Sequence, residues 1–314
     1  MPYSRLFCAG ALLLSSLTSW AQKPLKKDEV LVFAYFKGNG EDGLHLATSS
    51  DGLQWTALNQ DKSLLTPTVS KDKLMRDPCI IRGQDGLFHM VWTTSWHDRG
   101  IGYASSKDLV HWSPQQDIPV MAGEPTAKNC WAPEITYDAP HQQYLIYWAT
   151  TIPGRFPAGE TTLEGGNNHR IYYVATKDFK TYTPAQVLYD QGFNVIDATV
   201  QPAGKRFAMF LKDETREPIQ KNLRVAFADQ AAGPYGPPSA PITGAYWAEG
   251  PTAIQLGSKW LVYFDKYTEH KYGAVTSTDL VHWTDISDQI QFPKGTRHGT
   301  VFRISKKELA RLPQ

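Results

Sequence analysis

The sequence predicts an all-β fold, a five-bladed β-propeller, on three observations. First, a phrase made of an alternating strand, a turn with an aspartate and an aromatic residue recurs along the chain. Second, the aromatic residues that end successive copies lie 57, 70, 53 and 48 residues apart, and repeats of about 40–50 residues are typical of propellers. Third, β-branched and aromatic runs separated by turns fill most of the chain, with no helical periodicity before the last ten residues. The five copies span residues 43–55, 100–112, 169–182, 223–235 and 272–283.

Each repeat has the pattern of four short strands, which is one propeller blade. Four innermost strands are recognisable at residues 77–81, 132–136, 196–200 and 249–254. The N-terminal repeat lacks an inner strand, and residues 298–304 supply one from the other end of the chain. We therefore expect the C-terminal strand to pair with the N-terminal blade and close the ring, which removes open sheet edges. The recurring aspartates are expected to form turns: Asp51, Asp108, Asp178 and Asp279.

The first 21 residues are set apart from the rest of the chain. Arg5 gives a positive start, residues 6–17 are apolar, and Ser19-Trp20-Ala21 fits a cleavage site with small residues. This pattern predicts a signal peptide over residues 1–21, followed by a single propeller domain over residues 22–314. The protein is then expected in the periplasm or outside the cell.

Charge and composition exclude several classes of partner. Lys and Arg total 32 against 31 Asp and Glu, so the net charge is +1 and no basic patch favours nucleic acid or an anionic membrane. No segment after the predicted signal peptide is apolar enough to span a bilayer, and we expect a monomer. Export would permit a disulfide between Cys79 and Cys130, although two buried free thiols fit the sequence equally well.

Acidic residues begin three of the expected inner strands, in register with one another. Asp77, Asp197 and Glu249 fall on the first, third and fourth of these strands, and strand starts face the propeller axis at one end. A buried carboxylate is costly unless it is paired or functional. One such acid would more often cap a turn, but three around one axis suit glycoside hydrolysis. That reaction needs a protonated carboxyl for the leaving oxygen, an ionised one to activate water, and benefits from a third that tunes the first.

Five short motifs in a fixed order carry a resemblance to a known family. They are Arg-Asp-Pro at 76–78, Trp-Ala-Pro-Glu at 131–134, Ile-Asp at 196–197, Glu-Gly-Pro at 249–251 and Arg-His-Gly at 297–299. Over residues 30–305 the chain resembles glycoside hydrolase family 43, whose members are five-bladed propellers that include arabinofuranosidases and xylosidases. The chain departs from the usual pattern in having Glu134 where aspartate is common, and in a three-strand segment before the first motif.

The resemblance implies roles for the three acids. Asp77 becomes the general base, Glu249 the general acid, and Asp197 the residue that orients the acid and modulates its pKa. The family inverts configuration, so the carboxyls of Asp77 and Glu249 should lie roughly 6.5–9.5 Å apart. Glu134 is expected to be a structural partner, and residues 22–314 would be the catalytic domain.

Other residues are candidates for binding the substrate or an ion. The binding candidates are Trp96, Trp131, Trp247, Arg297, Lys212 and Lys266. The tryptophans either stack on sugar or pack, Arg297 binds hydroxyls or pairs with Asp77 or Glu249, and the two lysines end second strands in register. In the related enzymes a histidine at the position of His298 can hold a water-coordinated cation, often calcium; the alternative is a hydrogen-bonded core histidine. The chemistry requires no cofactor. The insert at residues 152–168 is either a surface insertion or part of a pocket mouth.

The expected function is therefore that of an exo-acting, inverting glycoside hydrolase. The preferred substrate is a terminal α-L-arabinofuranoside on plant polysaccharide or oligosaccharide, with β-D-xyloside or galactofuranoside as alternatives within the family. A retaining fructan hydrolase would need an Asn-Asp-Pro-Asn motif near the start, which the sequence lacks. A non-catalytic carbohydrate-binding propeller should have lost at least one of the acids, whereas all three are present.

Overall fold

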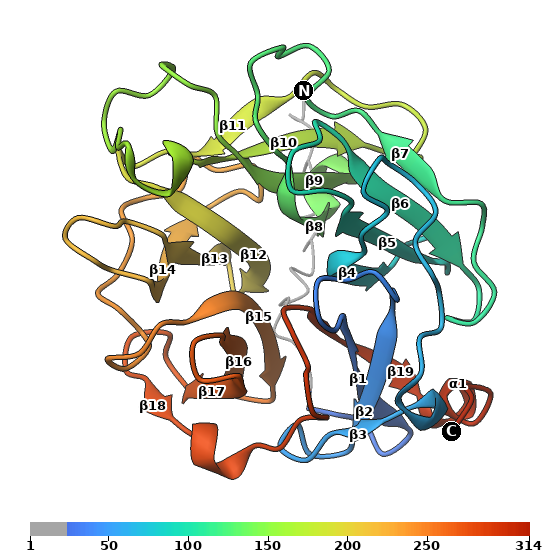
Figure 1. The fold of residues 1–314 in the computed structure, drawn as a ribbon. Coiled ribbons are helices and arrows are strands. Elements are labelled where there is room, and N and C mark those ends of the chain that lie inside the picture. Colours follow the sequence, from blue (N-terminus) through green and yellow to red (C-terminus); the bar gives the residue numbers. More distant parts are fainter. Residues whose placement is uncertain (1–23) are drawn as a thin grey trace, which may run out of the picture.

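Five β-sheets surround a central axis in the computed structural model, which describes residues 24–314 (Figure 1). The predicted signal peptide lies outside the described residues. Blades are numbered here from the first inner strand along the chain. Blade 1 contains β4 (Arg76–Arg82), β5 (Phe88–Thr93), β6 (Ile101–Ser106) and β7 (Gln116–Ile118). Blade 2 contains β8 (Trp131–Asp138), β9 (Gln143–Thr150), β10 (Arg170–Thr176) and β11 (Gln186–Tyr189).

The other three blades complete the ring. Blade 3 contains β12 (Val195–Ala203), β13 (Arg206–Asp213) and β14 (Asn222–Ala228). Blade 4 contains β15 (Glu249–Leu256), β16 (Lys259–Lys266), β17 (Lys271–Ser277) and β18 (Thr284–Asp285). Blade 5 contains β19 (Thr300–Ser305), β1 (Glu29–Tyr35), β2 (His45–Ser49) and β3 (Thr56–Ala57). Short 3-10 helices connect some strands: η1 (Asn59–Asp61), η2 (Ala139–His141), η3 (Leu163–Gly165) and η4 (Ser287–Gln289). A short helix, α1 (Lys306–Leu309), follows the last strand.

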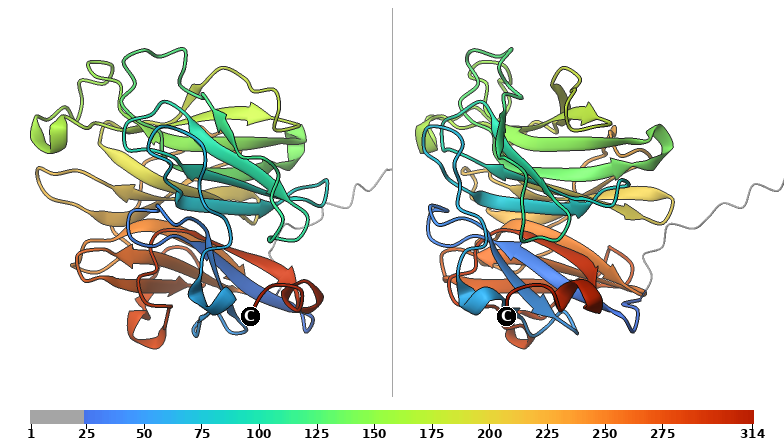
Figure 2. Two further views of the ribbon diagram at one scale, coloured as in Figure 1. Left: turned by 45° about the vertical axis from the view of Figure 1, so that its right-hand side comes forward. Right: turned by 90° about the vertical axis from the view of Figure 1, so that its right-hand side faces the viewer.

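The ring closes as the sequence predicted. Strand β19 is the inner strand of blade 5 and pairs antiparallel with β1, from Glu29 opposite Ser305 to Ala34 opposite Thr300. Figure 2 shows the red C-terminal strand beside the blue N-terminal strands. The two ends of the described chain thus share one sheet, and their mutual pairing leaves no gap in the propeller.

Blade 3 departs from the expected four strands at its outer edge. Residues 236–242 lie along β14 and donate three backbone hydrogen bonds to it, to the carbonyls of Phe227, Val225 and Leu223. Three of the seven residues are prolines, Pro237, Pro238 and Pro241. Proline has no N–H to donate, so this segment cannot form a continuous ladder and stays an irregular edge.

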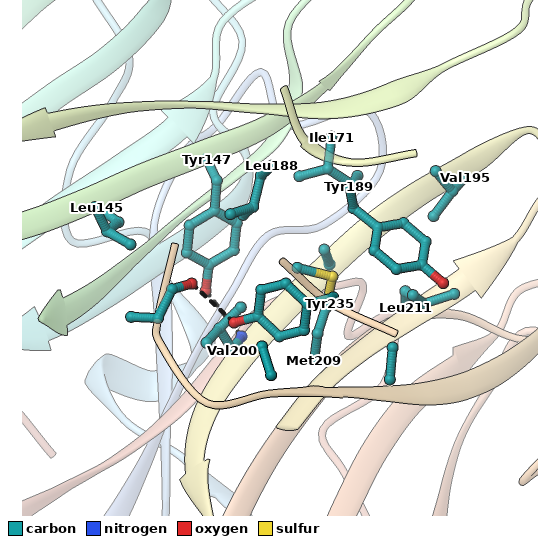
Figure 3. Packing of buried hydrophobic residues seen from close by; sticks show 14 of the residues in the cluster. Leu145, Tyr147, Ile171, Leu188, Tyr189, Val195, Val200, Met209, Leu211 and Tyr235 are labelled. Atoms are coloured by element: carbon teal, nitrogen blue, oxygen red, sulfur yellow. Dashed lines mark hydrogen bonds between the residues drawn. The ribbon is translucent and has the colours of Figure 1, made fainter. Parts of the chain in front are cut away.

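Hydrophobic packing joins neighbouring blades, and the repeated aromatic residues explain how. Five clusters of buried side chains each lie between two adjacent blades. Each cluster contains one aromatic residue of the repeat. These residues are Tyr235 between blades 2 and 3, Tyr182 between blades 1 and 2, Trp112 between blades 5 and 1, Trp55 between blades 4 and 5, and Trp283 between blades 3 and 4. Figure 3 shows the cluster between blades 2 and 3, where the Tyr147 hydroxyl accepts a hydrogen bond from the backbone N–H of Val200 at 2.9 Å. The repeat therefore encodes the contacts between blades.

The four repeated aspartates form turns, as predicted. In the turn at Asp108, for example, Oδ1 accepts the backbone N–H groups of Val110 and His111 at 3.0 and 2.8 Å. Ser106 caps the same turn, because its hydroxyl oxygen accepts the N–H of Leu109 at 2.9 Å. The same pattern occurs at Asp51, Asp178 and Asp279. These carboxylates therefore stabilise the turns in which they lie.

The two cysteines of the described chain are buried free thiols. Both belong to the cluster between blades 1 and 2, and burial raises the pKa of the Cys130 thiol. Within residues 24–314, no helix has the length and apolar character needed to cross a bilayer.

Candidate active site

Four inner strands share an irregularity near their first residues. The pairing of each with its second strand shifts there, as in a β-bulge. One residue in each bulge has a positive φ: Asp77 (52°), Ala132 (46°), Asp197 (52°) and Gly250 (60°). Bulges re-aim side chains and are frequent beside active sites.

The bulges correct the expectation that the three acids are in register. Asp77 and Asp197 occupy the positive-φ position of their bulges, whereas Glu249 precedes that position in blade 4. Glu249 is therefore equivalent to Arg76 of blade 1 and Ile196 of blade 3, each of which pairs with the second strand. The acids come from two different positions of the repeat, and the longer side chain of glutamate is the one placed at the earlier position.

Gly250 is required at the positive-φ position of blade 4 by its neighbour. A Cβ atom on Gly250 would lie 2.3 Å from Cγ and 2.6 Å from Cβ of His298. The absence of a side chain therefore allows the His298 ring to pack against the bulge. This contact joins blade 4 to the segment that leads into β19.

An axial cavity of about 260 Å³ opens at the end of the ring where the inner strands begin. The lining includes nine of the residues predicted from sequence: Asp77, Trp96, Trp131, Asp197, Lys212, Trp247, Glu249, Arg297 and His298. Side chains that sequence reasoning missed also line it, among them Thr93, Glu214, Lys221 and Tyr267. Blades 1 to 4 and the segment that leads into blade 5 all contribute to the cavity, so the ring assembles residues that are far apart in the chain.

Lys266 is the predicted binding residue that does not line the axial cavity. Its ammonium lies 2.9 Å from Glu269 and 4.0 Å from the ring centroid of Tyr246. The expected register with Lys212 is wrong by one residue, because Lys212 pairs with Ile196 while Asp265 pairs with Glu249. Successive strand residues point to opposite faces, so Asp265 takes the position equivalent to Lys212.

Asp77 and His298 form a buried ion pair in the lining of the cavity. His298 Nδ1 lies 3.3 Å from Asp77 Oδ1, and Oδ2 accepts a hydrogen bond from the Thr93 hydroxyl at 2.8 Å. Burial alone would raise the pKa of Asp77, but the hydrogen bond and charge of His298 lower it to about 2. Burial alone would lower the pKa of His298, but the hydrogen bond and charge of Asp77 outweigh burial and raise this pKa to about 9. At neutral pH both groups are ionised.

Asp197 is buried close to the same histidine, in a different electrostatic environment. Its Oδ2 accepts the backbone N–H of Gly250 at 2.9 Å and lies 3.9 Å from His298 Nδ1. Burial raises the pKa of Asp197 to about 6; the charge of His298 opposes this shift, and the charge of Glu249 adds to it. Asp197 can therefore hold a proton near neutral pH.

Glu249 is held between two cations. Lys212 Nζ donates to Oε2 at 3.0 Å, and Arg297 Nη2 donates to Oε1 at 3.2 Å. Burial would raise the pKa of Glu249, but the charges of Lys212 and Arg297 outweigh it and lower the pKa. Of the alternatives for Arg297, pairing with Glu249 is the one that the structure shows. Without substrate, Glu249 is a carboxylate.

Each of these two cations has a second acidic partner. Lys212 Nζ lies 2.7 Å from Glu214 Oε2, and Arg297 Nε donates to Asp265 Oδ2. Glu214 in turn contacts a further lysine, Lys221. Cations and carboxylates thus alternate along one wall of the cavity, an arrangement termed here the charge ladder: Lys221, Glu214, Lys212, Glu249, Arg297 and Asp265.

Glu214 and Asp265 were missed by reasoning from sequence, although a signal was present. Each is close to a lysine at the end of a second strand, and only the lysines were considered. Burial raises the pKa of Asp265 to about 6 against the charge of Arg297. An acid within two residues of a lysine that lies near the end of a second strand is the feature that would have found both.

Aromatic rings form the mouth of the cavity. The rings of Trp96 and Trp131 meet edge to face, with centroids 5.5 Å apart, and Trp96 is 37% exposed. Their indole N–H groups donate hydrogen bonds within the protein: that of Trp96 to Asn39 Oδ1, and that of Trp131 to the carbonyl of Trp96. Arg76 covers one face of Trp96 at 4.2 Å. Flat rings fixed in this way offer surface for stacking without an unpaired polar group.

The described residues offer little to a directly coordinated metal. Residues 24–314 contain no group of three or more His, Cys, Asp or Glu side chains arranged to hold one. A histidine must be neutral to act as a ligand, whereas Asp77 keeps His298 protonated. Glu134, buried near the axis, has its pKa raised to about 7 by burial. A calcium ion held near His298 through a coordinated water, with no direct bond to the ring, stays a prediction.

The insert at residues 152–168 lines a separate groove. This groove, of about 470 Å³, is bounded by the insert, Thr151 and Glu217, and no described residue of the insert lines the axial cavity. The buried side chain of Arg170 anchors the insert, donating to Asn168 Oδ1 at 2.7 Å and to the carbonyl of Ala158 at 2.8 Å. The insert is a fixed part of the rim beside the cavity.

Comparison with known sequences identifies a family. A family model described as a probable glycosyl hydrolase domain, related to glycoside hydrolase family 43, matches residues 28–310. A curated α-L-arabinofuranosidase from Bifidobacterium longum subsp. longum is 22% identical over 198 residues, or 56% of this chain and 18% of that protein. The chain thus corresponds to less than a fifth of that relative's length.

Solved structures show the same fold at low sequence identity. A thermostable family-43 glycoside hydrolase has a TM-score of 0.55 and 16% identity, covering 71% of this chain and 78% of that one. An α-L-arabinofuranosidase from Lactobacillus brevis has a TM-score of 0.52 and 18% identity, with coverage of 68% and 72%. An exo-β-1,3-galactanase from Phanerochaete chrysosporium has a TM-score of 0.53 and 12% identity, with coverage of 67% and 49%. Because the family match extends over nearly all of the described residues, the chain belongs to the family-43-related glycosyl hydrolases.

Proposed function

We propose that the protein is an exo-acting, inverting glycosidase that releases terminal α-L-arabinofuranosyl residues. The observation that carries the proposal is the convergence of three carboxylates, from blades 1, 3 and 4, on one cavity. In the proposed reaction Asp77 takes a proton from a water molecule whose oxygen attacks the anomeric carbon. The bond to the leaving oxygen breaks on the opposite face of the sugar, and Glu249 gives that oxygen its proton.

The surroundings of Asp77 support its role as the base. Its pKa of about 2 keeps the carboxyl ionised at any physiological pH. One oxygen is held by Thr93 and the other faces His298, so the carboxylate is fixed before substrate arrives. The separation from Glu249 that an inverting mechanism requires, roughly 6.5–9.5 Å, stays part of the proposal.

Glu249 needs a proton before it can act as the acid. In the ligand-free site Lys212 and Arg297 favour its ionised form, so substrate binding must change that balance. Arg297 is the more exposed of the two, and Asp265 offers it a second partner. Burial and the charge of Glu249 both raise the pKa of Asp197. Asp197 is therefore a neighbouring acid that can share a proton with Glu249.

The size and lining of the cavity support action on a chain end. A volume of about 260 Å³ is below the roughly 300–1,000 Å³ of pockets for drug-sized ligands, which suits one sugar unit. Arabinofuranose is preferred because two similar proteins are named α-L-arabinofuranosidases. The similar exo-β-1,3-galactanase makes a galactoside the second candidate, ahead of a β-D-xyloside.

Export, assembly and partner of the whole protein form part of the proposal. Residues 1–21 direct export to the periplasm or beyond, the mature chain is a monomer, and its partner is a carbohydrate. N-terminal sequencing of the exported protein checks cleavage after Ala21. Light scattering of the purified chain checks its mass.

A panel of aryl glycosides tests the function. The mature chain is assayed on 4-nitrophenyl α-L-arabinofuranoside, β-D-xylopyranoside, β-D-galactofuranoside and β-D-galactopyranoside, together with Glu249→Ala and a Glu217→Ala control from the neighbouring rim. We expect turnover of the arabinofuranoside by the wild type and the control. On an unactivated arabino-oligosaccharide, Glu249→Ala should lose at least about 100-fold in kcat. Sugar binding without turnover of any glycoside would support the carbohydrate-binding alternative and reject the proposal.

A further inference from the structure

The charge ladder contains two carboxylates for which the proposed reaction has no direct use, Glu214 and Asp265. We infer that they are positioning residues that allow Glu249 to become neutral, by giving each cation beside it a second anionic partner. The inference rests on the proposed role of Glu249 as the acid. As the acid, Glu249 must hold a proton while it lies between the positive charges of Lys212 and Arg297.

Protonation of Glu249 would otherwise leave buried charge without a partner. Lys212 is 1% exposed, and its ammonium donates to Glu249 at 3.0 Å. If Glu249 were its sole carboxylate, adding a proton there would orphan a desolvated cation. Breaking a buried pair in this way is strongly unfavourable, so the site would resist forming the acid that the reaction needs.

Glu214 removes this obstacle on the Lys212 side. Its Oε2 lies 2.7 Å from Lys212 Nζ, so the ammonium keeps one carboxylate in either protonation state of Glu249. The position of Glu214 is fixed, because its backbone N–H donates to the carbonyl of Asn194 at 2.8 Å and its side chain also contacts Lys221. The ring of Tyr267, 4.6 Å from Lys212 Nζ, completes the enclosure of the ammonium.

Asp265 has the equivalent position on the Arg297 side. It pairs with Glu249 across blade 4 and accepts from Arg297 Nε, while Nη2 of the same guanidinium reaches Glu249. When Glu249 is protonated, Lys212 therefore still has Glu214 as a partner and Arg297 still has Asp265. The remaining charged groups around Glu249 are Asp197 and His298, contributed by β12 and by the segment before β19.

The test is a comparison of Glu214→Gln with the wild type and with a matched control, Glu217→Gln. Glu217 is three residues further along the same loop and lines the separate groove. Two quantities are measured: the pH profile of kcat/KM on arabinofuranosides with good and poor leaving groups, and the pKa of Glu249 by carboxyl ¹³C NMR. In Glu214→Gln, Glu249 is the one carboxylate still paired with Lys212, so the pKa of Glu249 should fall by about one unit. The alkaline limb of the profile should move to lower pH by the same amount.

The dependence of the loss in kcat on the leaving group distinguishes this positioning role from a purely structural one. At pH 7 the loss in kcat should be about tenfold on a poor leaving group, which needs the acid, and small on 2,4-dinitrophenyl arabinofuranoside, which does not. Adding Lys212→Met to Glu214→Gln should return the limb towards higher pH, because the cation is then gone. The Glu217→Gln control should match the wild type in all these measurements.

Three results would overturn the inference: an unchanged pKa of Glu249 in Glu214→Gln, an equal loss on both leaving groups, or no return in the double variant. Asp265→Asn provides a second variant with the same expectation if Glu214→Gln does not fold. The NMR titration does not need turnover. Absence of glycosidase activity would therefore reject the proposed function, while the pKa of Glu249 would still decide the role of Glu214.

Discussion

Replacing Gly250 by alanine perturbs the centre of the site while every ionisable residue is retained. The new methyl would lie 2.3 Å from Cγ and 2.6 Å from Cβ of His298. These atoms are near the backbone and cannot swing aside as the tip of a long side chain can. The His298 ring must therefore leave its position beside Asp77, and the buried ion pair is broken.

The magnitude has two parts. Alanine at a φ of +60° costs roughly 1–2 kcal/mol relative to glycine. Separating a buried ion pair costs about 3–5 kcal/mol when one charge stays buried without its partner. The free energy of unfolding should thus fall by about 4 kcal/mol or more. The pKa of His298 should return from about 9 towards the ordinary value of about 6.5.

Ala132→Gly is the matched control, because Ala132 occupies the equivalent position of the bulge in blade 2 at φ 46°. Its change in stability should stay within about 1 kcal/mol. Urea denaturation at pH 7 measures both variants, and proton NMR of the imidazole follows the titration of His298. A Gly250→Ala protein within 1 kcal/mol of the wild type, with the pKa of His298 unchanged, would refute the account of this contact.

Three further predictions concern pH, turns and metal. The pKa of His298 is raised, so the stabilisation that the wild type has over His298→Gln should be full below about pH 6.5 and disappear as pH rises through about 9; thermal melting from pH 5 to 10 measures it. Asp108→Ala removes two backbone hydrogen bonds in a turn and should cost about 1–2 kcal/mol in urea denaturation while leaving kcat within twofold. Removal of divalent ions by EDTA should leave turnover of an aryl arabinofuranoside within twofold, and a larger loss would show that a bound ion supports the site.

The propeller was readable from sequence because its determinants are local and repeated. A turn aspartate makes its hydrogen bonds to residues two and three positions away, so Asp108 and its equivalents form the same turn wherever the phrase occurs. The aromatic that follows, such as Trp55, fills the space between blades. Closure of the ring followed from counting, since one repeat lacked an inner strand and residues 298–304 had no other partner.

The inner arrangement of the site was not readable, for a physical reason. A bulge adds one residue to a strand, and a shift of one residue moves a side chain to the other face. The sequence shows an acid at the start of three strands but not that Asp77 and Glu249 occupy different positions of the bulge. The same shift exchanged the expected Lys266 for Asp265. Glu214 reaches Lys212 through the course of a loop, which no local pattern specifies.

The central claim is that Asp77 and Glu249 hydrolyse a glycosidic bond by direct attack of water. Proton NMR of the first minutes of hydrolysis of an α-L-arabinofuranoside by the purified mature chain tests this directly, because the anomeric proton reports the configuration of the first-formed sugar. The account predicts β-L-arabinose as the initial product, followed by slow mutarotation. Initial release of α-L-arabinose would contradict it, since retention requires a covalent intermediate and would exclude Asp77 as a base that activates water.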